Sequence, residues 1–139
     1  MATEDRNLIK DLILSSFVKW SGDANGGLPG ARKAYKKVIQ NMYPTFAFYK
    51  SCLQVENTLG KSDKDGQANV EFLFEMASRL DNYKEDIYLS YLSYLQSQNK
   101  FDKANAVYWK ATKEVADKEA FDLRYKSITN GAVYNVFAS

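Results

Sequence analysis

The sequence of 139 residues contains no histidine and only one cysteine. Histidine is the commonest general base near neutral pH and a frequent zinc ligand, so much acid–base and metal chemistry is excluded. With Cys52 as the single cysteine, the chain can form neither an internal disulfide nor a cysteine zinc site. No glycine-rich loop ending in Lys-Ser or Lys-Thr is present to hold phosphates. We therefore expect no catalytic residues, no metal, no cofactor and no small-molecule substrate.

Long apolar runs and a strong charge of one sign are also absent. The 19 basic and 17 acidic residues give a net charge of +2, which does not by itself indicate a nucleic-acid-binding protein. The longest apolar run near the start, LILSSFV at 12–18, is too short to cross a membrane. Hydrophobic residues make up 45% of the chain, enough for a packed core. We expect one soluble domain over residues 1–139.

Between the few prolines and glycines, the apolar residues recur with a helical period. Pro29 suits the first turn of a helix, and Asp102 and Asp117 each precede a periodic stretch as candidate N-caps. The pattern predicts seven helices, at about 5–20, 29–42, 45–59, 67–80, 84–98, 102–116 and 118–130. The connections are short, as in antiparallel helix pairs.

Internal similarity points to repeats of roughly 34 residues. Three segments share a pattern of small, aromatic and then small or apolar residues: ARKAYKKV (31–38), VEFLFEMA (70–77) and ANAVYWKA (104–111). A second aromatic series, Phe48, Tyr88 and Phe121, heads helices at matching offsets. This spacing predicts an all-α fold, an α-solenoid of about three stacked antiparallel helix pairs. The expected units are 5–42, 45–80 and 84–116, with a capping helix at 118–130 and a tail at 131–139.

These motifs resemble the half-a-tetratricopeptide (HAT) repeat family. In that family the second helix of a repeat reads Ala-Arg-x-Ile-Tyr-x-x-Ala, which ARKAYKKV matches closely and ANAVYWKA matches with Asn105 in the arginine position. The first-helix pattern Trp-x-x-Tyr is similar to IYLSYL, with Tyr88 in place of Trp and Tyr91 matching. Phe48 and Glu56 fit the preceding repeat. The resemblance covers about 15–130.

In the order of its stretches, the chain is similar to the C-terminal repeats of HAT proteins associated with the U3 small nucleolar RNA. The resemblance implies a non-catalytic protein–protein scaffold in the small-subunit processome, serving pre-18S rRNA processing and ribosome biogenesis in the nucleolus. The partners would be other protein subunits, with RNA association indirect. A HAT scaffold of splicing or of messenger RNA 3′-end processing is an alternative.

The repeat pattern also predicts core residues. Trp109 leaves two interpretations open, because adjacent residues on a helix point about 100° apart and the ring lies off the main apolar stripe. Either Trp109 packs against a neighbouring repeat, which we favour, or it faces a partner. The predicted core residues are Tyr35, Phe48, Phe74, Tyr88, Tyr91, Tyr108, Trp109 and Phe121.

A basic helix face offers the second candidate site. Arg32, Lys33, Lys36 and Lys37 lie opposite the apolar residues of ARKAYKKVIQ. A solvated helix face is the simpler interpretation, while a direct contact with RNA phosphates or an acidic partner is the sharper one. With no exposed aromatic residues interleaved, sequence-specific RNA recognition is not expected here.

Overall fold

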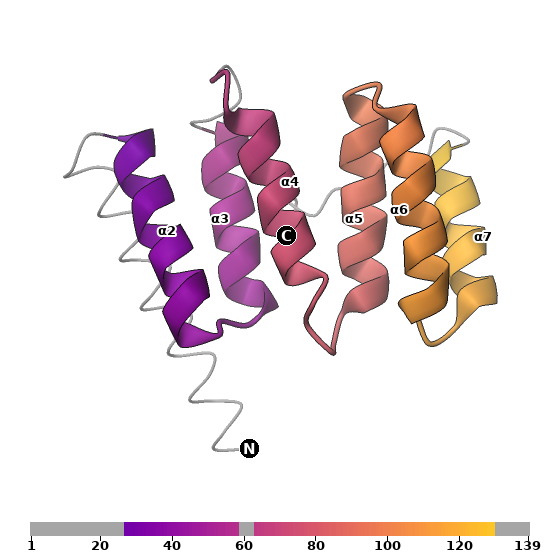
Figure 1. Ribbon diagram of the computed structural model, residues 1–139. Helices are drawn as coiled ribbons and strands as arrows, with labels where there is room; N and C mark the ends of the chain where they lie inside the picture. The colour runs from indigo at the N-terminus through magenta and orange to yellow at the C-terminus, as the bar shows by residue number, and fades with distance from the viewer. Residues whose placement is uncertain (1–26, 59–62, 130–139) are drawn as a thin grey trace. The chain divides into compact units, whose positions relative to one another are not determined.

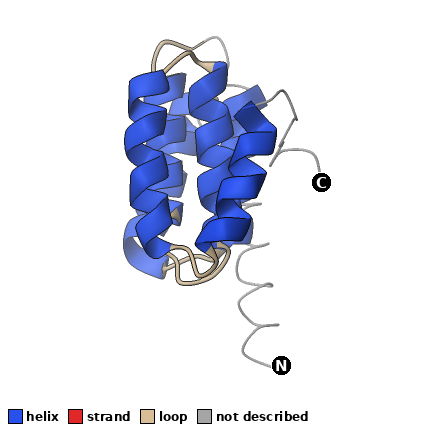
Figure 2. Ribbon diagram, turned by 90° about the vertical axis from the view of Figure 1, so that its right-hand side faces the viewer, coloured by secondary structure: helices blue, strands red, loops and turns tan. Residues whose placement is uncertain are grey.

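A computed structural model describes residues 27–58 and 63–129, and this part of the chain is helical with short turns and no strand (Figures 1 and 2). The predicted all-α class is confirmed. The predicted helix at 5–20 and the tail at 131–139 lie outside the described residues. The described helices are α2 (Leu28–Met42), α3 (Phe46–Thr58), α4 (Gly66–Ala77), α5 (Lys84–Ser97), α6 (Phe101–Glu114) and α7 (Lys118–Thr129).

The helix starts show which local signals determined the boundaries. Pro29 lies in the first turn of α2 as predicted. The Asp117 carboxylate accepts a hydrogen bond from the Ala120 N–H at 3.0 Å, which is the expected N-cap of α7. The predicted cap at Asp102 is wrong, because α6 begins one residue earlier, after Lys100, without a side-chain cap. Asp102 instead lies in the first turn, where a negative charge favours the helix dipole.

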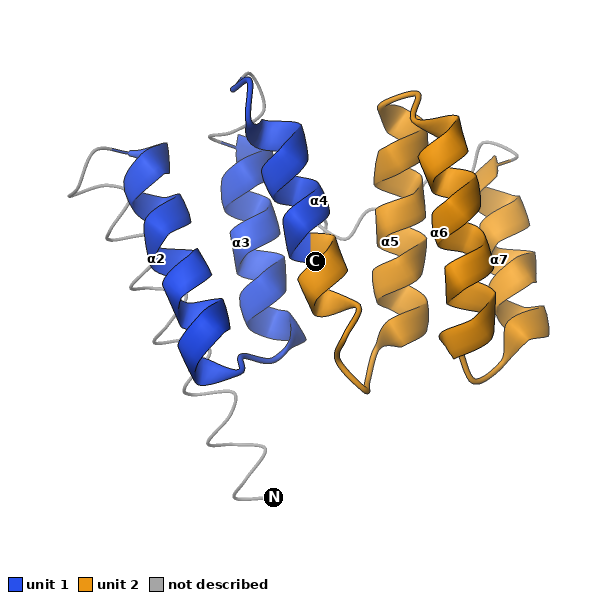
Figure 3. Ribbon diagram, in the orientation of Figure 1, with its two compact units in different colours: residues 1–73 blue, residues 74–139 orange. Residues whose placement is uncertain are grey.

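The chain forms two compact units, residues 1–73 and 74–139, and the division falls within α4 (Figure 3). In the first unit, α2 packs against α3. In the second unit, α5 packs against both α6 and α7. Each unit has a core of aromatic and aliphatic side chains, with Leu53 and Leu73 fully buried in the first and Leu89, Leu92 and Leu95 in the second.

Most of the predicted core aromatic residues are buried. Six of them are at most 2% exposed: Tyr35, Phe48, Phe74, Tyr88, Tyr91 and Phe121. Tyr108 is half-buried. The favoured core position of Trp109 is wrong, because its side chain is 56% exposed. Tyr108 takes the position that stacks on α7, and the adjacent Trp109 points about 100° away from it around the α6 axis.

Candidate interaction surfaces

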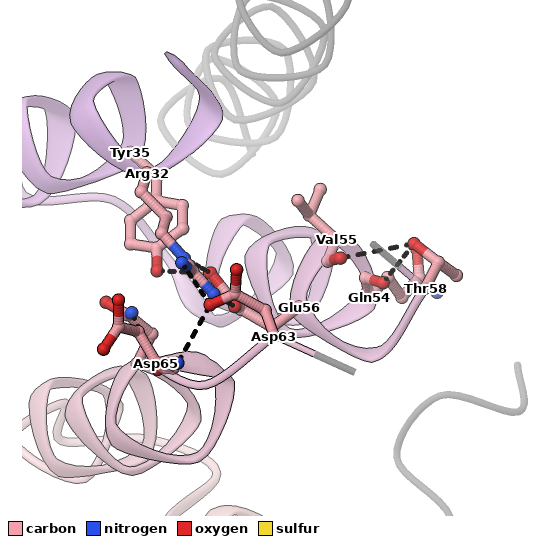
Figure 4. A network of polar contacts seen from close by, with 9 residues as sticks. Arg32, Tyr35, Gln54, Val55, Glu56, Thr58, Asp63 and Asp65 are labelled. Carbon is pink, nitrogen blue, oxygen red and sulfur yellow. Dashed lines mark hydrogen bonds and ion pairs between the residues drawn. The ribbon is translucent and has the colours of Figure 1, made fainter. Parts of the chain in front are cut away.

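A buried ion pair joins α2 to α3 at the predicted basic face (Figure 4). The Arg32 guanidinium donates two hydrogen bonds to the Glu56 carboxylate, from Nε at 3.0 Å and from Nη2 at 2.8 Å. The Tyr35 hydroxyl donates a third to the same carboxylate at 2.7 Å. Glu56 is 1% exposed, so its charge depends on these three donors for compensation.

Asp63 extends this network from the segment before α4. Arg32 Nη1 donates to Asp63 Oδ1 at 2.9 Å, and the Asp65 backbone N–H donates to the same oxygen at 2.9 Å. These two hydrogen bonds, the backbone one first, hold the pKa of the Asp63 carboxyl below its usual range. The bonds to Glu56 raise the pKa of the Arg32 guanidinium, so the charge stays in place.

The structure therefore corrects the predicted basic face. The Arg32 side chain is only 12% exposed, and its planar fork is occupied within the first unit, so it is not a surface cation for RNA or an acidic partner. Lys36 is half-buried, with Nζ 5.5 Å from the ring centroid of Phe72 on α4. Lys33 and Lys37 are exposed. Two of the four predicted residues thus remain as an exposed basic pair.

Tyrosine hydroxyls donate to carboxylates on neighbouring helices throughout the described chain. Within each unit, these bonds join a buried or half-buried tyrosine to an acidic residue on another helix. The pairs are Tyr35–Glu56 (2.7 Å), Tyr91–Glu75 (2.8 Å), Tyr88–Glu114 (2.7 Å) and Tyr108–Asp122 (2.5 Å). Of these carboxylates, Glu56 alone was marked by the sequence motif. The bonds allow large aromatic rings to be buried without leaving a hydroxyl unpaired.

Tyr108 anchors an aromatic cluster between α6 and α7. Its ring stacks on Tyr125, with centroids 4.7 Å apart, and on Phe121 at 6.1 Å. The hydrogen bond to Asp122, helped by partial burial, raises the pKa of the Tyr108 hydroxyl to about 12. Lys126 and then Tyr108 hold the pKa of the Asp122 carboxyl below its usual range. The cluster fixes the position of the Tyr108 ring from both sides.

Trp109 lies at the edge of this cluster and is largely open to solvent. Its ring contacts Tyr108 edge-on, with centroids 5.3 Å apart and planes at 75°. On the same outward side of α6, Ala106 and Lys113 are exposed one turn before and one turn after Trp109. We call Ala106, Trp109 and Lys113 the α6 outer strip. It presents an exposed tryptophan ring, a residue type that is enriched at protein interfaces, beside an exposed lysine.

Other types of functional site find no support in the part of the chain that the structure describes. Within residues 27–58 and 63–129, no three acidic or cysteine side chains gather in a way that could hold a metal ion. No helix among these residues is long and apolar enough to span a membrane.

Comparison of the chain with known protein families, with curated proteins and with solved structures finds no match. The HAT assignment therefore remains a prediction from the sequence motifs.

Proposed function

We propose that this protein is a non-catalytic scaffold that binds other protein subunits of a ribonucleoprotein assembly. In this proposal its helices form an α-solenoid of about three stacked antiparallel pairs, as in HAT repeats. The repeated tyrosine–carboxylate bonds support the proposal, since they join successive helices in a similar way: Tyr35 of α2 to α3, Tyr88 of α5 to α6, and Tyr108 of α6 to α7.

The exposed Trp109 is the observation that carries the binding role. Burying a large aromatic side chain is stabilising, and the Trp109 ring, which is 56% exposed, keeps apolar surface that a partner can bury. The ring also contacts Tyr108 edge-on, and such a contact reduces the conformational entropy that the side chain would lose on binding. Rigid aromatic side chains of this kind are frequent energetic centres of protein interfaces.

The resemblance to U3-associated HAT proteins places the proposed activity in the nucleolus, in the small-subunit processome that produces 18S rRNA. To test this, the tagged chain would be expressed in cells, crosslinked, purified and analysed by mass spectrometry. Enrichment of pre-ribosomal proteins together with a nucleolar fluorescence signal supports the proposal. Enrichment of splicing or 3′-end-processing factors favours the alternative HAT scaffolds, and recovery of no ribonucleoprotein subunit contradicts the proposal as a whole.

A direct RNA-binding role is the second candidate, and the exposed pair Lys33 and Lys37 is the observation that favours it. Reversing both lysines to glutamate should then reduce the salt dependence of RNA binding by about two phosphate contacts. Arg32 is left intact because its removal would leave the buried Glu56 carboxylate without its ion-pair partner and destabilise the fold. Reversal of Lys110 and Lys118, two exposed lysines of the second unit, is the matched control. Equal loss in both variants would indicate non-specific attraction and remove this candidate.

A further inference from the structure

We draw no further inference here: the strongest candidate, the surface patch formed by the α6 outer strip around Trp109, has exposed charges of both signs at Asp102 and Lys113, and nothing in the described residues shows what covers it.

Discussion

Replacing Glu56 with glutamine should destabilise the protein by about 2–4 kcal/mol, because it leaves the Arg32 charge without its main partner. The amide cannot reproduce the geometry, since its NH2 group would face the donors of Arg32 or Tyr35. Removing one member of a fully buried pair costs about 3–5 kcal/mol. The Arg32 side chain keeps 12% exposure and its bond to Asp63, so the expected loss is smaller than for a fully buried pair.

Urea unfolding followed by circular dichroism at 222 nm measures this change, with a decrease in melting temperature of about 10 °C as the thermal counterpart. Tyr35→Phe is the matched control, since it removes one hydrogen bond and keeps the ion pair, at a cost of about 1–2 kcal/mol. The double variant Arg32→Met, Glu56→Leu should be more stable than Glu56→Leu alone, because it removes both charges together.

The reasoning about the buried network would be refuted by a Glu56→Gln variant within about 0.5 kcal/mol of the parent. It would also be refuted if the double variant were no more stable than Glu56→Leu, since the two charges would then not depend on each other.

Three further outcomes follow from the structure. Phe121→Ala should cost about 3–5 kcal/mol in urea unfolding because the ring is fully buried, whereas Trp109→Ala should cost about 1 kcal/mol, and equal losses would contradict the exposed position of Trp109. The lowered pKa of Asp122 gives stability that is present at neutral pH and lost as the pH falls through that pKa, so Asp122→Asn should flatten the acid limb of the stability curve. The raised pKa of Tyr108 gives stability that is present below the unfolded pKa of 10.0 and is lost as the pH rises toward 12. An absorbance titration should show one tyrosine that ionises near pH 12, and this step should be absent from the titration of Tyr108→Phe.

The helix positions could be predicted from the sequence because local signals determine them. Five of the six described helices begin and end within two residues of the predicted bounds. The exception is α4, predicted to reach residue 80 and observed to end at Ala77. Its continuation tightens into turns in which the Arg79 and Leu80 N–H groups bond three residues back, and the Ser78 hydroxyl donates to the Glu75 carbonyl. The residue at which a helix ends in this way cannot be predicted from the spacing of apolar residues, because it depends on the local backbone geometry.

The candidate sites were harder to predict because they depend on contacts between helices. A helical wheel correctly places Arg32 opposite the apolar stripe of α2, but it contains no information about Glu56 or Asp63, which lie 24 and 31 residues away. The glutamate in the repeat motif was the available signal for this pair. The exposure of Trp109 could not be predicted for the same reason. The sequence gives the angle of Trp109 on α6, but its 56% exposure depends on how the helices pack in the tertiary structure.

Recovery of partner proteins after nuclease treatment tests the central claim most directly. The tagged chain would be purified from nuclear extract with and without exhaustive RNase digestion, and the bound proteins would be quantified by mass spectrometry. The scaffold account predicts that ribonucleoprotein subunits stay bound at the same level after the RNA is removed. Loss of all these proteins on RNase treatment would contradict it, because the chain would then be held in the assembly by RNA.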